Sequence, residues 1–226
     1  MSASFDELRL TRRQLLKSVA LAAAAWKGGS WLITAPEAFA QTAPDDPWIV
    51  PTLEAFADTL IPGEKRSPTD RAIAGAMSGP GAVQAGAVDL MNFPATGASE
   101  ATPAIAAALN AQATAYAAQH SVLLDPTVAP LVSLSFEHRT TLLVQLLDST
   151  GEDQLAYFAF AALAFLAYHT AGHLHLADAV RNGHPGMVAL GFPQPDDDDL
   201  WRFPEFSYRR TLAKKHPDTV KRGNPA

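Results

Sequence analysis

The chain has 226 residues, of which 17 are basic and 23 are acidic, and it contains no cysteine. This length suits one sizeable hydrophobic core, since domains typically take about 100–200 residues. The missing cysteine excludes disulfide scaffolds, thiolate zinc sites, iron–sulfur clusters, covalently attached haem and a cysteine nucleophile. Any catalytic chemistry would therefore come from histidines, carboxylates, hydroxyls or a partner.

Residues 1–40 have the pattern of a cleavable export signal. A charged start is followed by the short apolar run 19–26 and by Ala38-Phe39-Ala40, an Ala-x-Ala cleavage pattern. The segment 11–17 resembles a twin-arginine motif, and the alternative is an ordinary basic amphipathic helix. The apolar run is too short for a membrane anchor, which needs roughly 20 residues. The residues that carry the signal are Arg12, Arg13, Leu15, Lys17, Ala38 and Ala40.

A twin-arginine signal predicts that the protein crosses the membrane already folded, through the twin-arginine translocase, to a periplasmic or extracellular location. Folding would then take place in a reducing cytoplasm, which agrees with the missing cysteines. Cleavage after Ala40 would leave 12 of the 17 basic and 20 of the 23 acidic residues, and would change the net charge from −6 to −8. Such an acidic balance argues against a nucleic-acid partner.

Residues 41–226 are predicted to form one helical domain. Apolar residues at helical spacing predict a first helix over 53–60 and a second, short one over 82–92. Thr102-Pro103 is typical of a helix start, and Ser135 opens a fourth helix that runs to Asp148. Period-two alternation is scarce, so the fold class is all-α.

The fifth predicted helix, over 153–182, is the longest and the most apolar. Its part from Leu155 to Tyr168 has no charged residue, and spans about 21 Å against a bilayer core of ~30 Å. This favours a buried central helix over a membrane span. We expect an irregular bundle of about five helices around this helix, followed by a proline-broken, aromatic C-terminal segment over 183–226, and no stable membrane span after residue 40.

Two histidines near the end of this fifth helix are the candidates for a metal site. His169 and His173 are four residues apart, a spacing that puts both imidazoles on one face of a helix. The alternative is a pair of partly buried, hydrogen-bonded histidines. No complete metalloenzyme, GxGxxG or GxSxG motif is present, so the sequence predicts neither a nucleotide-binding domain nor a hydrolase.

The C-terminal segment is a candidate interface. Between residues 200 and 210, four aromatic residues and three arginines occur without helical or strand periodicity, and these residue types carry much of the binding energy at interfaces. The alternative is a segment that wraps over the protein's own helices. The candidate interface residues are Trp201, Arg202, Phe203, Phe206, Tyr208 and Arg209.

Two segments resemble the gluconate 2-dehydrogenase subunit 3 family. Residues 55–62 read Ala-Phe-Ala-Asp-Thr-Leu-Ile-Pro, and residues 79–91 begin Gly-Pro-Gly-Ala and continue through Ala85-Gly86. The twin-arginine signal and the later leucine-rich helix follow the same order as in that family. The resemblance covers about half of the chain, without the longest helix and the aromatic segment, as expected for a divergent relative.

The resemblance implies a role that composition alone does not. Members of this family are small subunits without catalytic residues or a cofactor of their own. Each pairs with a large FAD-containing subunit of the glucose-methanol-choline (GMC) oxidoreductase type, assists its folding and carries it across the membrane. Whether a cytochrome subunit joins the complex stays open. The competing hypotheses are an exported α-helical metalloprotein or enzyme that uses His169 and His173, and a binding module without a flavoprotein partner.

Overall fold

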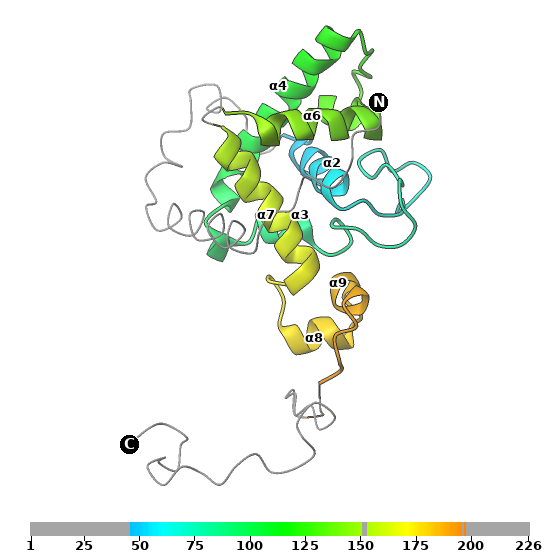
Figure 1. Cartoon of the computed structure of the whole chain (residues 1–226), viewed down its shortest axis with the longest axis vertical. Coiled ribbons are helices and arrows are strands. Elements are labelled where there is room, and N and C mark those ends of the chain that lie inside the picture. The colour runs from blue at the N-terminus through cyan, green and yellow to red at the C-terminus, as the bar shows by residue number, and fades with distance from the viewer. Residues whose placement is uncertain (1–45, 151–152, 196, 198–226) are drawn as a thin grey trace, which may run out of the picture.

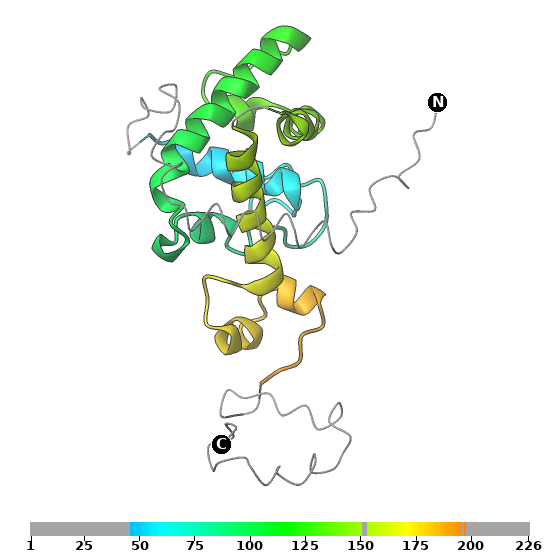
Figure 2. The same cartoon turned by 60° about the vertical axis from the view of Figure 1, so that its left-hand side comes forward.

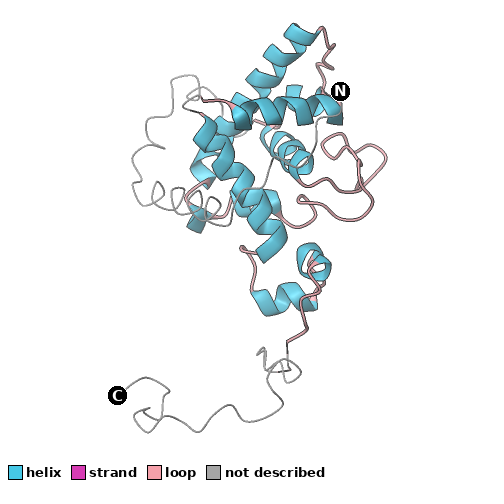
Figure 3. Ribbon diagram, viewed as in Figure 1, coloured by secondary structure: helices cyan, strands magenta, loops and turns pink. Residues whose placement is uncertain are grey.

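The computed structural model describes residues 46–150, 153–195 and 197. In this part of the chain the secondary structure is helical throughout, without strands (Figure 3), which confirms the all-α prediction. Two single-turn 3₁₀ helices, η4 (Pro94–Thr96) and η5 (Ser99–Ala101), separate α3 from α4. The eight described α-helices are α2 (Ile49–Leu60), α3 (Ala87–Met91), α4 (Thr102–His120), α5 (Pro130–Ser133), α6 (Phe136–Asp148), α7 (Gln154–Thr170), α8 (Leu176–Arg181) and α9 (Pro185–Ala189).

The helix at the centre of the bundle is α2. It lies among the other helices (Figures 1 and 2) and contacts α3, α4, α5, α6 and α7. Its side chains Leu53 and Phe56 are 0% and 1% exposed. The prediction of a central helix over 153–182 is therefore wrong. An uncharged sequence was the basis for that prediction, yet α2 is more completely enclosed although it contains Glu54 and Asp58.

The predicted fifth helix is broken into two. Helix α7 ends at Thr170, because Ala171 takes a left-handed conformation with φ 50° and its N–H bonds back to the carbonyl of Ala167. After a short loop α8 begins at Leu176, and α9 then returns to pack against α7. Gly186 allows this return, since a Cβ at that position would overlap the carbonyl oxygen of Tyr168. The predicted total of about five helices is too low, because this helix is divided and because α5 and α9 were not predicted.

Three other helix predictions agree with the structure within a few residues. Helix α2 contains the predicted segment 53–60, α4 begins at Thr102 with a proline in its first turn, and Ser135 caps α6 by accepting a hydrogen bond from the N–H of His138. The helix predicted over 82–92 is shorter than expected. Gly86 has φ 81°, so residues 82–86 form turns and only Ala87–Met91 are helical.

Among the described residues, no helix combines the length and the apolar character needed to cross a membrane. Helix α7 has 17 residues, or about 25 Å, which is shorter than the ~30 Å hydrocarbon core of a bilayer.

Candidate interaction surface

One face of α7 is apolar and exposed. Leu155, Phe158, Phe165 and Leu166 are between 41% and 49% exposed, and Ala162 lies exposed between them. At 100° per residue, these five side chains fall within about 100° of the helix circumference. We call this set the α7 stripe. His169 continues it at the C-terminal end, where its ring lies parallel to that of Phe165 at a centroid distance of 6.4 Å.

The opposite face of α7 packs into the protein against α2, α3, α6 and α9. This buried face combines three alanines, which permit close approach of neighbouring helices, with larger side chains that fill the spaces between them. Since neither face of α7 carries a charge between residues 155 and 168, hydrophobic periodicity does not distinguish the exposed face from the buried one. The buried residues are Tyr157, Phe160, Ala161, Leu163, Ala164 and Ala167.

Exposed apolar side chains are concentrated in this C-terminal part of the described chain. Of the 15 large hydrophobic residues that are exposed, nine lie between residues 155 and 192. Four of these nine residues belong to the α7 stripe, and the other five belong to α8, α9 and the adjoining loops. An exposed apolar face along one helix typically marks an interaction site. The five further residues are Leu174, Leu176, Val188, Leu190 and Phe192.

The two histidines predicted to share a metal do not lie on one helix face, because α7 ends between them. His169 is exposed on the stripe, whereas His173 packs against Gly86, where a Cβ would overlap its ring. Burial lowers the pKa of His173, with nearby Asp89 acting in the opposite direction and His184 reinforcing the shift. In the described residues, no group of three or more His, Asp or Glu side chains is arranged to hold a metal ion.

His173 and His184 nevertheless form an unusual pair. Both Nδ1 atoms are buried without a hydrogen-bond partner, while Nε2 of His184 lies 3.1 Å from the carbonyl oxygen of Ala85. The two rings thus hold the loop after α7 and the start of α9 against the turn that precedes α3.

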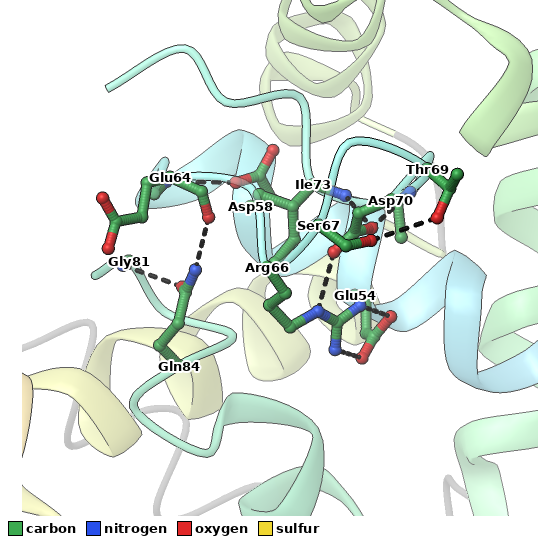
Figure 4. Close-up of polar contacts among 12 residues, drawn as sticks. Glu54, Asp58, Glu64, Arg66, Ser67, Thr69, Asp70, Ile73, Gly81 and Gln84 are labelled. Atoms are coloured by element: carbon green, nitrogen blue, oxygen red, sulfur yellow. Dashed lines mark hydrogen bonds and ion pairs between the residues drawn. The ribbon is translucent and has the colours of Figure 1, made fainter. Parts of the chain in front are cut away.

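The polar side chains around α2 form a structural network. Arg66 pairs with Glu54 of α2 and with Asp70, and the latter pair is 2.7 Å apart (Figure 4). The carboxylate of Asp58, which is 1% exposed, accepts hydrogen bonds from the N–H groups of Gly63 and Ala74. These contacts fasten the long loop between α2 and α3 to the central helix.

A groove of about 410 Å³ lies beside this network, between α2, the loop that follows it and the start of α5. Its charged side chains are already paired, Arg66 with Glu54 and Asp70, and Arg71 with Asp125 at 3.2 Å. A ligand in the groove would therefore compete with existing ion pairs. The groove does not present the unpaired acid, base or nucleophile that a catalytic site requires.

The predicted signal and tail residues lie outside the described part of the chain. These are Arg12, Arg13, Leu15, Lys17, Ala38 and Ala40, and Trp201, Arg202, Phe203, Phe206, Tyr208 and Arg209. Sequence reasoning did not predict the α7 stripe, although one signal was present. Alanines at 161, 164 and 167 share one side of the helix, and the larger Phe158, Phe165 and Leu166 share the other.

Comparisons with known proteins give a family but no characterised relative. Neither the curated proteins nor the solved structures contain a match. A family model matches residues 48–226, from the residue before α2 to the end of the chain. The chain therefore belongs to DUF5987, a family of unknown function.

Proposed function

We propose that this protein is the non-catalytic small subunit of an exported, FAD-dependent dehydrogenase of the GMC type. In this role it binds the large flavoprotein subunit, assists its folding and provides the twin-arginine signal for export of the pair. The observation that carries the proposal is the α7 stripe, since a half-exposed apolar helix face is typical of a surface that binds another protein.

The arrangement of the family-like segments supports the same proposal. Residues 55–62 lie in α2 and its end, and residues 79–91 lead into α3, which packs against both α2 and α7. Gly63 and Gly81 make the close approach between these segments possible, because a Cβ on Gly63 would overlap the backbone of Gly81. The two segments thus form one packed unit that supports the buried side of α7.

The charged groups of the described residues fit an accessory role. Asp58, Arg139 and the Arg66 cluster are engaged in contacts that hold loops in place, and the groove beside them has paired charges. The alternative of a metalloprotein that uses His169 and His173 has no comparable support, because the two side chains occupy different surroundings.

An obligate pair of subunits typically buries upwards of roughly 2,000 Å², more than one helix face supplies. The exposed residues of α8 and α9 extend the surface, and we expect the C-terminal segment to contribute as well. Completing the burial of each half-exposed leucine or phenylalanine of the stripe is worth about 1 kcal/mol by its apolar area. The stripe would therefore supply several kcal/mol to association.

Replacing Phe158 and Phe165 together by serine tests this proposal. Both side chains are partly exposed, so the double variant should keep its helical content and its unfolding midpoint nearly unchanged. We expect it to lose the FAD-containing large chain that co-purifies with the unaltered protein. The control is Leu123→Ser, which changes a side chain that is 95% exposed outside the α7–α9 region. Undiminished recovery of the flavoprotein with the double variant would contradict the proposed surface.

A further inference from the structure

We infer that, in the free protein, the chain's own C-terminal segment covers the α7 stripe. Residues 201–208 would lie along the exposed face of α7, antiparallel to the helix, until a partner displaces them. This inference concerns the chain by itself and does not depend on what the partner is. It rests on the position from which the segment starts, on its length, on its charges and on the extent of the family match.

The described chain ends beside α8 and α9, the two helices that follow the end of α7. Helix α9 packs against α7, and Gly186 at its start lies against the carbonyl of Tyr168. Beyond α9 the chain is held by hydrogen bonds from the N–H of Phe192 to Met187 in α9 and from the side chain of Gln194 to Val180 in α8. The C-terminal segment therefore begins at the α8–α9 pair, of which α9 contacts α7.

The lengths match. From Pro195 to Trp201 an extended chain spans about 20 Å, which is about twice the diameter of the helix α9 that packs against α7. Residues 201–208 span about 23 Å when extended. The stripe itself, from Leu155 to Leu166, runs for about 17 Å along the helix. Four aromatic side chains within these eight residues are thus enough to cover its whole length.

The charges determine the direction. No charged residue lies between Leu155 and Tyr168, but Asp148 and Asp153 lie at the N-terminal end of α7, where α6 stops and α7 begins. A segment that starts at the C-terminal end of the helix and runs antiparallel to it brings Arg209 and its neighbour Arg210 to these carboxylates. The aromatic part then contacts the uncharged stripe, and the arginines meet the acidic end.

The family match includes the whole segment. It begins at Trp48, directly before α2, and it continues through residue 226. The region that the family model covers therefore includes both α7 and the aromatic segment.

Cysteine cross-linking tests the inference directly, because the native chain has no cysteine to interfere. In the full-length protein, Ala162→Cys is combined with Pro204→Cys, since the antiparallel register places position 204 opposite Ala162. The control combines Pro204→Cys with Ala115→Cys, which changes an exposed alanine on α4. We expect at least about fivefold more intramolecular disulfide in the first pair at equal oxidant, beyond what tethering alone gives. Replacing Trp201, Phe203 and Phe206 by serine should reduce this excess to the control level.

Two further pairs test the direction. Thr150→Cys lies between α6 and α7, and His169→Cys lies at the other end of the stripe; each is combined with Thr211→Cys. The antiparallel arrangement predicts that the Thr150 pair cross-links several-fold more than the His169 pair. Equal yields from the Ala162 and Ala115 pairs, with circular dichroism showing both variants folded, would overturn the inference. Disulfide-linked dimers as the main product would also overturn it, because a second copy would then occupy the stripe.

Discussion

Arg139 shows how one buried side chain can join separate parts of a fold. It is 2% exposed, and its guanidinium donates hydrogen bonds to four backbone carbonyl oxygens, two of them at 2.6 Å. Burial lowers its pKa to about 10, and the nearby carboxylate of Asp58 acts in the opposite direction. One planar group thereby connects α6, the chain before it and the loop after α2. The four acceptors belong to Arg71, Ala72, Val132 and Leu134.

Arg139→Lys should destabilise the protein by about 3 kcal/mol, because a single ammonium does not replace the five donors of the guanidinium fork. The measurement is the urea midpoint of unfolding followed by circular dichroism. Arg71→Lys serves as the control, since that side chain is 52% exposed and pairs only with Asp125. A midpoint for Arg139→Lys equal to that of the control would show that the network contributes little to stability.

His173 makes stability depend on pH. Its pKa in the folded protein lies below the ordinary value, so the fold favours the neutral ring. The stabilisation is therefore complete above about pH 6.5, the pKa of an unfolded histidine, and is lost as the pH falls from there through the lower pKa of the folded state. We expect the urea midpoint to fall between about pH 7.5 and about pH 5. His173→Gln should reduce this fall, whereas the exposed His175→Gln should leave it unchanged. An equal fall in both variants would exclude His173 as its source.

At the scale of the helix, the structure shows why some elements could be predicted and others could not. The start of α4 at Thr102-Pro103 and the cap of α6 at Ser135 are encoded within a few neighbouring residues. The end of α7 is not, because Ala171 is an ordinary helix former that takes φ 50° only where α9 packs back against α7. Tertiary packing thus decides what local propensity leaves undetermined.

Helix α4 ends on a residue that is poorly suited to its conformation. Ser121 caps the helix with φ 55° and is exposed, a position at which glycine is usual. Ser121→Gly should stabilise the protein by about 0.5–1 kcal/mol, since glycine relieves the strain of the left-handed conformation. Thermal unfolding measures the change, with the nearby exposed Gln119→Gly as a control that should destabilise. Destabilisation by both substitutions would contradict the assigned cap geometry.

At the scale of the whole molecule, the sequence predicted an all-α domain but placed the wrong helix at its centre. The uncharged run 155–168 indicated burial, yet one face of it, about 100° wide, is exposed, whereas α2 with its two carboxylates is enclosed by five other helices. The helix is apolar all round because both of its faces, the buried one and the exposed one, carry apolar side chains. One face packs into the bundle, and the other is exposed among the described residues.

The candidate surface could be predicted only in part for the same reason. Composition indicated a protein without an obvious catalytic motif, and the aromatic residues near the C-terminus indicated an interface. The position of the α7 stripe depends on which side of this apolar helix faces the bundle. Contacts of α7 with α3 and α9 determine that side. Helix α3 is distant from α7 in the sequence, and α9 follows α7 only after a turn and α8. The residue pattern of a single sequence does not show those contacts, so it could not predict which face is exposed.

Export of the flavoprotein tests whether this chain acts as its carrier. A GMC-type flavoprotein that binds this chain, as proposed above, is expressed with either the unaltered chain or the Arg12→Lys/Arg13→Lys variant, and dehydrogenase activity outside the cytoplasm is measured. Arg9→Lys, outside the arginine pair, is the matched control. We predict that the double variant abolishes exported activity while the control retains it, and that the flavoprotein then accumulates in the cytoplasm. Undiminished exported activity with the double variant would contradict the proposed role.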